Sequence, residues 1–321
     1  MVGVRRPFRL GLELPPLELP PPAAPVAPHG STGPARLDDH VAAIVAARDA
    51  GFDTVWLSDR HRAGEVAADA LTLAGGLADV AAPLTIGVMA DVVGARHPAV
   101  LARDVTCLDV VSAGRSAVLL YDSAPSGPGT GPAAVADRFG RLGEAAAICR
   151  SLLTSGGPRP AGRFFRLGEV DDRPRPIQAG GPRVVVDLGH LADPEGELAW
   201  GTGNVPEGLT ECLRSADAVV VGGSPAQVRS ARRAIGRICR SAGAGAVPPL
   251  LWRGAPPVDG PAPPVVAPPP RQQAATPVTM GALSSAGAEG AIVRLGLSAP
   301  PSRAEVNKLQ RWWGAEPGAA S

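Results

Sequence analysis

Eight short apolar runs recur along this 321-residue chain, and segments with helical periodicity separate most of them. Several runs are rich in Val, Ile and Leu without alternation, which is typical of strands buried on both faces. Such an alternation of strand and helix predicts a parallel sheet, and eight repeats favour a closed (β/α)8 barrel, the TIM barrel, over an open sheet. The predicted strands cover residues 8–13, 54–57, 84–89, 116–121, 183–187, 217–221, 249–252 and 290–295, and the main predicted helices cover residues 38–50, 69–80, 98–111, 135–153, 225–241 and 302–313.

An open doubly wound sheet is the alternative, and it requires a dinucleotide-binding glycine motif. The run Gly127-Pro128-Gly129-Thr130-Gly131 is a poor candidate, because Pro128 blocks the tight turn and no strong helix opens after it. We therefore predict a single barrel domain over residues 1–321. The long connection 122–182 departs from plain alternation, which predicts an excursion between strands 4 and 5 with a small hairpin or irregular segment around 164–167.

Charge and cysteine content narrow the classes of partner. Formal net charge is only +1, without a basic stripe, although residues 225–241 have an arginine-rich outer face; we expect no nucleic-acid or membrane partner. No run of about 18 apolar residues occurs, so no membrane span is predicted. The four cysteines are far apart and form no Cys-x-x-Cys pair, which predicts reduced thiols, no metal site and a cytoplasmic protein. Prolines concentrate in residues 15–28 and 248–270, which we interpret as extended loops.

Polar side chains follow several predicted strands at the point where each strand ends. Active sites of (β/α)8 barrels lie at the carboxyl ends of their strands, so these residues are the candidates. Asp59 and His61 form the sharpest cluster, because a histidine titrates near neutrality and can act as an acid or base. A solvent-exposed loop with an Asp59–Arg60 pair is the alternative. The other candidates are Asp91, Tyr121, Asp187, Gly189, His190 and Ser224.

Structural interpretations compete with functional ones at other positions. His97, within Arg96-His97-Pro98, invites a catalytic interpretation, but orienting the start of helix 98–111 is favoured. Asp109 and Arg115 are expected to bridge the turn before strand 4. Ser224 is either the N-cap of helix 225–241 or a hydroxyl that joins the free N–H groups of that helix in binding a phosphate.

An ordered set of short motifs connects these elements. It runs through Gly51-Phe52-Asp53, Trp56, Asp59, Asp69, His97-Pro98, Leu108-Asp109 and Ser112-Ala113-Gly114-Arg115, and continues at Arg138–Leu153, Gly162-Arg163-Phe164-Phe165 and Arg175-Pro176-Ile177-Gln178. In order and spacing this set resembles the bacterial luciferase-like flavin-dependent monooxygenases, which include deazaflavin (F420)-dependent oxidoreductases. The resemblance covers about residues 8–190, and no single tripeptide in it is specific.

The resemblance implies an oxidoreductase or monooxygenase that uses FMN or F420 on a small organic substrate. It implies that the cofactor ring lies near Asp59, His61, Asp91 and Tyr121, with the phosphate end near Gly189, His190 and Ser224. FMN chemistry would require reduced flavin from a separate flavin reductase. Relatives commonly dimerise through helices of the first half, so a homodimer, or a heterodimer with a paralogue, is expected.

One departure from the family favours a different function. After strand 5 the relatives often show Gln-Ala-Gly-x-Ser, which holds the flavin phosphate, whereas this chain has Asp187-Leu188-Gly189-His190-Leu191. A carboxylate near a phosphate is unfavourable unless a positive group neutralises it. The alternative is therefore a degenerate, non-catalytic barrel, with cofactor binding lost, that serves as the partner or regulator of an active paralogue.

Overall fold

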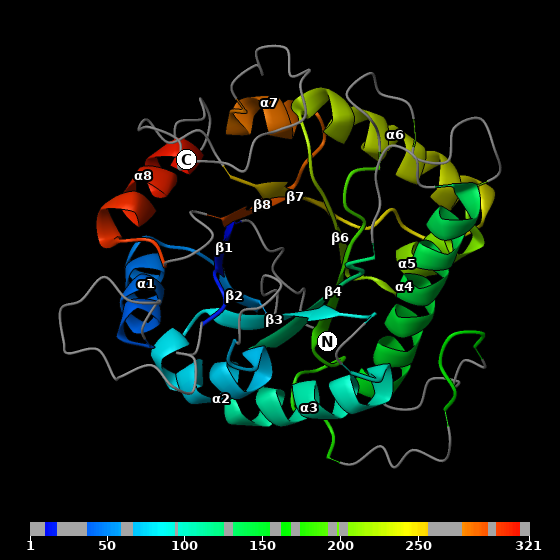
Figure 1. Ribbon diagram of the computed structural model, residues 1–321. Coiled ribbons are helices and arrows are strands. Elements are labelled where there is room, and N and C mark those ends of the chain that lie inside the picture. Colours follow the sequence, from blue (N-terminus) through cyan, green and yellow to red (C-terminus); the bar gives the residue numbers. More distant parts are fainter. Residues whose placement is uncertain are drawn as a thin grey trace.

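The protein is a closed barrel of eight parallel strands in sequence order, with helices around its outside (Figure 1). The computed structural model describes residues 10–17, 37–58, 67–93, 96–124, 131–154, 162–167, 174–191, 198, 205–255, 278–294 and 300–314. The strands are β1 (Leu10–Leu14), β2 (Thr54–Ser58), β3 (Thr85–Asp91), β4 (Ser116–Tyr121), β5 (Arg183–Asp187), β6 (Ala218–Val221), β7 (Leu250–Gly254) and β8 (Gly290–Arg294). Pairing of β1 with β8 closes the barrel, which confirms the predicted fold class.

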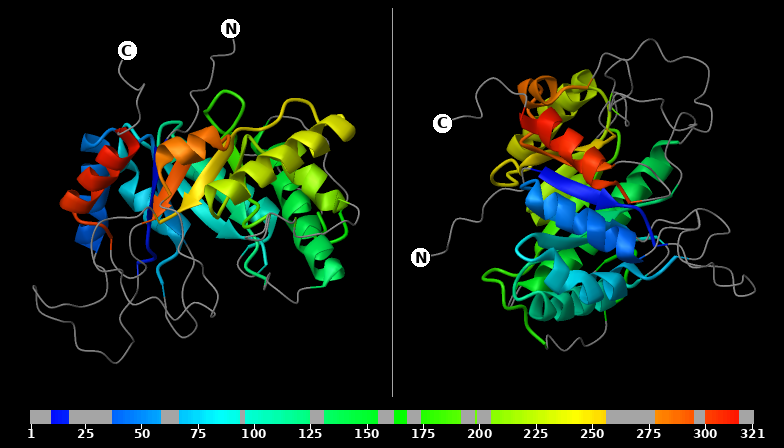
Figure 2. Two further views of the ribbon diagram at one scale, coloured as in Figure 1. Left: turned by 90° about the horizontal axis from the view of Figure 1, so that it is seen from above. Right: turned by 90° about the vertical axis from the view of Figure 1, so that its left-hand side faces the viewer.

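The helices form a layer outside the strands, as two further views show (Figure 2). They are α1 (Leu37–Asp49), α2 (Ala70–Ala81), α3 (Pro98–Val111), α4 (Pro132–Leu153), α5 (Glu207–Ser215), α6 (Pro225–Ser241), α7 (Met280–Ser285) and α8 (Arg303–Gly314). No helix in the described part of the chain is long and apolar enough to span a membrane.

Sequence patterns missed the two shortest helices, α5 and α7. Helix α5 is short and includes Gly208, which weakens its helical periodicity. The structure explains that glycine, because a Cβ on Gly208 would overlap the backbone of α4 at Phe139 and Gly140, and a Cβ on Gly143 would overlap the carbonyl of Gly208. Helices α4 and α5 therefore pack backbone against backbone, and this close approach excludes larger side chains.

The described residues 162–167 of the excursion between β4 and β5 dock on α4. Residues 162–167 contain no strand. The Glu144 carboxylate accepts hydrogen bonds from the N–H groups of Arg163, Phe164 and Phe165, at 2.6–3.2 Å. The Phe164 ring lies against Gly140. Glu144 thus satisfies three backbone donors that a hairpin would have paired with a strand.

Trp56 fills the interior of the barrel. Its indole is fully buried and donates to the Thr54 hydroxyl at 2.9 Å. Gly11 on β1 and Gly87 on β3 face the ring, and a Cβ at either position would lie 2.8 Å or less from it. Trp56 is therefore a core residue, and its bulk closes the barrel below the carboxyl ends of the strands.

The expected bridge between Asp109 and Arg115 is wrong, although both residues are structural. Asp109 accepts from the Ser116 hydroxyl at 3.0 Å and from the N–H groups of Ile177 and Gln178 at 2.7 and 3.0 Å. The Arg115 guanidinium donates to two backbone carbonyls, those of residues 78 and 84, at 2.9 Å each. Donors from the segment before β5 reach Asp109, and sequence patterns do not reveal that long-range approach.

Candidate functional site

Three charged side chains meet inside the mouth of the barrel, at the carboxyl ends of β1, β5 and β7. Arg253 donates from Nε to Glu13 Oε2 at 2.7 Å and from Nη2 to Glu13 Oε1 at 2.6 Å. Its Nη1 donates to Asp187 Oδ2 at 2.9 Å. The Arg253 side chain is 12% exposed, and those of Glu13 and Asp187 are 3% and 7% exposed. We call Glu13, Arg253 and Asp187 the ionic layer.

Strand register explains why these side chains point inward. Glu13 pairs with Trp56 across β1 and β2, and neighbours in register on parallel strands point to the same face. The layer draws on odd-numbered strands, as layers inside (β/α)8 barrels do. Burial acts to lower the pKa of Arg253, but the Glu13 and Asp187 carboxylates outweigh it and raise that pKa above its ordinary value. Arg253 is therefore a permanent cation that neutralises one of two buried carboxylates.

The ends of β5 and β6 bring the predicted phosphate-end residues together. Gly189 adopts a left-handed conformation with φ of 68°, and its N–H donates to Asp187 Oδ1 at 2.8 Å. Gly222 N–H donates to the Gly189 carbonyl at 3.1 Å. A Cβ on Gly222 would lie 3.0 Å from Cε1 and Nε2 of His190, so the exposed imidazole lies against this glycine. These contacts bring together, at the mouth, Asp187, Gly189, His190 and Gly222. Arg253 pairs with the Asp187 carboxylate in this group.

Ser224 caps α6, as one of its two interpretations predicted. Its hydroxyl accepts from Gln227 N–H at 3.4 Å, and the Gln227 side chain accepts from Ser224 N–H at 2.8 Å. This reciprocal capping box uses two of the donors at the helix start, and Pro225 supplies no N–H. The helix end consequently has fewer free N–H groups for an anion than sequence patterns implied.

Sequence reasoning missed two arginines at the mouth. Arg253 directly follows the predicted strand 249–252, the same position that identified the other candidates. Arg138 lies near the start of α4, and both of its Nη atoms donate to the Leu188 carbonyl at 3.3 Å. Its Nη2 lies 3.0 Å from the place of a Cβ on Gly189. Among the described residues Arg138 has no carboxylate partner, and its buried Nε has no hydrogen-bond acceptor.

Asp91 and Tyr121 lie side by side at the ends of β3 and β4, where they are paired in register. Asp91 Oδ1 accepts from Val93 N–H at 3.0 Å and from Ser123 N–H at 3.2 Å. Tyr121 is buried and belongs to the interior cluster that includes Trp56. The backbone thus fixes the Asp91 carboxylate beside a buried phenol.

The predicted catalytic pair Asp59 and His61 lies outside the described residues. His97 caps α3, with Nδ1 accepting from Ala99 N–H at 3.3 Å, which confirms the structural interpretation. Its ring meets the edge of Phe165 with centroids 5.7 Å apart. In the described part of the chain, no group of three His, Cys, Asp or Glu residues is arranged to hold a metal ion.

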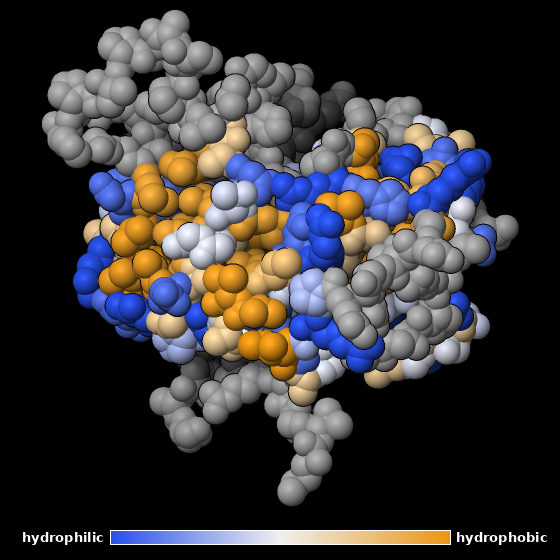
Figure 3. Space-filling model, turned by 90° about the horizontal axis from the view of Figure 1, so that it is seen from below, coloured by the Kyte–Doolittle hydropathy of each residue, from blue (hydrophilic) through white to orange (hydrophobic). Residues whose placement is uncertain are grey.

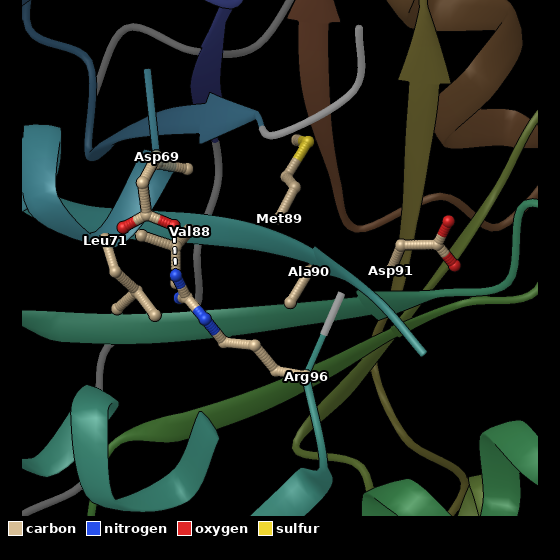
Figure 4. A pocket seen from close by; sticks show the side chains of 8 residues that line it. Asp69, Leu71, Val88, Met89, Ala90, Asp91 and Arg96 are labelled. Carbon is tan, nitrogen blue, oxygen red and sulfur yellow. Dashed lines mark hydrogen bonds and ion pairs between the residues drawn. The ribbon is translucent and has the colours of Figure 1, made fainter. Parts of the chain in front are cut away.

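A small pocket opens between β3 and α2 (Figure 4). Asp69 and Arg96 point toward one another and form an ion pair, while the Asp91 carboxylate lies apart from them. Asp69 also caps α2 by accepting from Thr72 N–H at 2.8 Å. Burial acts to raise the pKa of Asp69, but the Thr72 hydrogen bonds and the Arg96 charge lower it below its ordinary value. The lowered pKa favours the ionised form of Asp69. We therefore interpret Asp69 as a structural residue that caps α2 and pairs with Arg96.

The fold and this cluster of polar groups define a (β/α)8-barrel protein with its site at the carboxyl ends of the strands. A family model described as luciferase-like monooxygenase matches residues 23–249. The chain belongs to the luciferase-like monooxygenase family.

Solved structures support the same fold. An F420-dependent secondary alcohol dehydrogenase in complex with an F420-acetone adduct has a TM-score of 0.65 at 14% identity. The F420-dependent tetrahydromethanopterin reductase of Methanopyrus kandleri has a TM-score of 0.64 at 14% identity, and the monooxygenase RslO1 of Streptomyces bottropensis has 0.59 at 16%. Each comparison covers 95% of this chain and 97% of the other. A search of curated protein sequences finds no significant match.

Proposed function

We propose that the protein is an FMN- or F420-dependent oxidoreductase or monooxygenase that acts on a small organic substrate. One observation carries the proposal. The acidic residue that replaces the family's glutamine, Asp187, is paired with Arg253 at 2.9 Å, which offsets part of its repulsion of a phosphate at the adjacent turn. Family membership supports the same class of chemistry.

The residues at the ends of β5 and β6 fit the phosphate end of such a cofactor. Gly189 and Gly222 leave backbone surface without side chains, and His190 lies against that surface. Arg138 adds a cation that lacks a carboxylate partner among the described residues. Ser224 lies at the start of α6, where the helix dipole favours an anion. We assign these residues to phosphate binding because they combine positive charge with close backbone approach.

We assign the ring of the cofactor to the carboxyl ends of β2, β3 and β4. When bound, the cofactor supplies hydride transfer or oxygen activation. Asp91, fixed by two backbone donors, and the buried Tyr121 would orient the ring. His61 beside Asp59 would hold or deliver a proton to the substrate. The apolar cluster around Trp56 closes the barrel beneath the ring and excludes water from that side.

Self-association through the face formed by α2 and α3 is part of the proposal. Hydrophobic side chains gather on this face (Figure 3). Val100, Val110 and Val111 on α3 are 40–57% exposed, and Gly75 and Gly76 on α2 leave open space where a partner could approach. We propose a homodimer, or a heterodimer with a paralogue, through this face. With FMN, a separate flavin reductase would supply the reduced cofactor.

A second function, the degenerate barrel, is favoured by the ionic layer itself. Arg253 finds two carboxylates within the chain, so its positive charge is compensated without any ligand. The barrel would then act as the partner or regulator of an active paralogue. In either case we propose a cytoplasmic protein, since the thiols of Cys149 and Cys212 are buried and no cysteine pairs in a disulfide in the described residues.

Titration of purified protein with FMN and with F420, followed by fluorescence, separates the two functions. The oxidoreductase is expected to bind one of them saturably. His190→Ala is expected to weaken that binding about tenfold, because a charge-assisted hydrogen bond contributes about 1.5–3 kcal/mol. Gln310→Ala, an exposed change on α8, is the control and leaves affinity unchanged. Wild-type protein that binds neither cofactor would favour the degenerate barrel.

A further inference from the structure

Helix α6 carries a row of exposed arginines along one face. Arg229, Arg233, Arg237 and Arg240 are all exposed, whereas Val228, Ile235 and Ile238 on the opposite face are buried. The helix contains no aspartate or glutamate. We call these four residues the α6 stripe. The arginine-rich outer face expected of residues 225–241 is confirmed, and the chain's near-zero net charge conceals this local concentration.

None of the four guanidinium groups has an ion pair in the part of the chain that the structure describes. Several exposed arginines elsewhere do have one: Arg48 and Arg303 pair with Asp49, Arg103 with Asp104, and Arg163 with Asp137. Arg232, on the flank of the same helix, pairs with Glu289. The exposed Arg166, Arg214 and Arg311 also have no ion pair among the described residues, but each lies on a different element, whereas the α6 stripe places four such arginines in one row.

The spacing of these arginines lowers the stability of helix α6. Arg229 and Arg233, and again Arg233 and Arg237, are four positions apart, and like charges at this spacing lie next to each other on a helix. Arg229 also lies in the second turn of α6, toward the positive end of the helix dipole. Arg240, in the last turn, is placed where the helix dipole favours a cation, but Arg229, Arg233 and Arg237 gain no such contribution and have no ion pair among the described residues. Their charges are therefore available to an external anion.

We infer that the α6 stripe docks an acidic segment of a partner protein. The stripe spans about 16 Å along the helix and is one side chain wide, which matches one helix or strand with carboxylates at similar spacing. Guanidinium groups bind carboxylates through paired hydrogen bonds. The proposal does not depend on cofactor binding. Helix α6 lies across the barrel from α2 and α3 (Figure 1), so the proposed dimer through α2 and α3 leaves the α6 stripe free.

Two other anionic partners fit the stripe less well. A membrane surface requires apolar side chains beside the charges, and none of the large hydrophobic residues exposed in the described structure lies on α6. Single-stranded nucleic acid requires aromatic platforms, yet no tyrosine, tryptophan or phenylalanine occurs in α6. Duplex binding normally draws on a broad basic surface, whereas the whole chain has a net charge of +1.

The test compares four probes on the full-length protein. Two helical peptides of about 20 residues have the same composition, but one places its glutamates on a single face at four-residue spacing and the other spreads them around the helix. A DNA duplex of about 20 base pairs and vesicles containing phosphatidylserine complete the set. We expect the single-face peptide to bind tightest and its affinity to fall as salt rises.

Two matched variants decide the result. The first carries Arg229→Gln, Arg233→Gln, Arg237→Gln and Arg240→Gln, and it is expected to lose about tenfold or more in affinity for the single-face peptide. The second carries Arg48→Gln, Arg163→Gln, Arg303→Gln and Arg311→Gln, which remove the same charge from other exposed positions, and it is expected to stay within about twofold of wild type. All eight positions are exposed, so circular dichroism should show both variants folded.

Several outcomes would overturn the inference. Equal losses in both variants would indicate attraction to net charge alone. Equal binding of the two peptides would show that the spacing of the four arginines does not determine which peptide binds. Tighter binding of the duplex or the vesicles, lost on changing the stripe, would assign the surface to nucleic acid or lipid instead. Failure of wild-type protein to bind any probe would also contradict it.

Discussion

The indole of Trp56 lies directly against Gly87 on the neighbouring strand, and the two residues are paired in register. A Cβ on Gly87 would lie 2.8 Å from Cδ2 of the ring and closer still to two other ring carbons. Backbone on one side and a rigid aromatic on the other leave no room for adjustment. We predict that Gly87→Ala destabilises the fold by about 1–3 kcal/mol through overpacking, measured by urea unfolding.

Gly76→Ala is the matched control for that change. No atom lies within 4 Å of the place of its Cβ, and Gly76 is exposed within α2. Alanine is the better helix former, so this variant should gain about 0.5–1 kcal/mol. If Gly87→Ala unfolded at the same urea concentration as wild type, Trp56 would not be packed as described.

Removing the cation from the ionic layer should be among the most damaging single changes. Arg253→Met leaves Glu13 and Asp187 buried and without a positive partner, which is expected to cost about 3–5 kcal/mol at pH 7. Thermal unfolding at pH 7 measures the loss. A variant as stable as wild type would mean that Arg253 does not hold the two carboxylates as described.

Asp69 should stabilise the protein only above acidic pH. Because its pKa in the folded state is lowered below the ordinary value of 3.8, its ionised form contributes stability above that value, and the contribution is lost as the pH falls through the folded-state pKa. Asp69→Ala also removes the α2 cap and should cost about 0.5–2 kcal/mol at pH 7. Asp69→Asn keeps a cap, so it should cost less, and its difference from wild type should shrink as the pH falls below 3.8 and through the folded-state pKa.

The exposed cysteine should react with a thiol reagent faster than the buried cysteines. Burial raises the pKa of the Cys149 thiol to about 12 and also raises the pKa of the Cys212 thiol, while Cys107 is exposed on α3. We predict one fast-reacting thiol at pH 8 in folded protein, absent in Cys107→Ser. If α2 and α3 form the proposed dimer face, labelling of Cys107 should slow as protein concentration rises. Labelling independent of concentration would argue against that face.

The acidic residue at the end of β5 should tune anion binding. Asp187→Gln removes one carboxylate from beside the Gly189 turn and leaves Arg253 paired with Glu13 alone. Affinity for an FMN or F420 phosphate should therefore rise, by about threefold or more, because one repulsive charge is gone. Fluorescence titration beside His190→Ala checks the assignment. If neither change alters the affinity, the cofactor phosphate binds elsewhere.

The barrel could be predicted from sequence because apolar runs of four to six residues mark each strand without reference to the rest of the chain. Bounds for β4, β5, α3 and α6 agree with the structure residue for residue. Arg253 and Arg138 were missed because their importance comes from carboxylates and glycines distant in sequence. For the same reason Asp109 was paired with the wrong partner. The proximity of Asp91 and Tyr121 could be predicted, because residues at the ends of neighbouring parallel strands must meet at one edge.

The ionic layer also sets an order of events for a chain made from its N-terminus. Glu13 and Arg253 are 240 positions apart, so the first and seventh strands share an ion pair that neither can make early. While the nascent chain contains Glu13 and Asp187 but not yet β7, burying its two carboxylates without a cation would be costly, so we expect these strand ends to stay hydrated. Arg253 supplies the missing cation only shortly before β8, whose pairing with β1 closes the barrel, so we expect the mouth to be completed late.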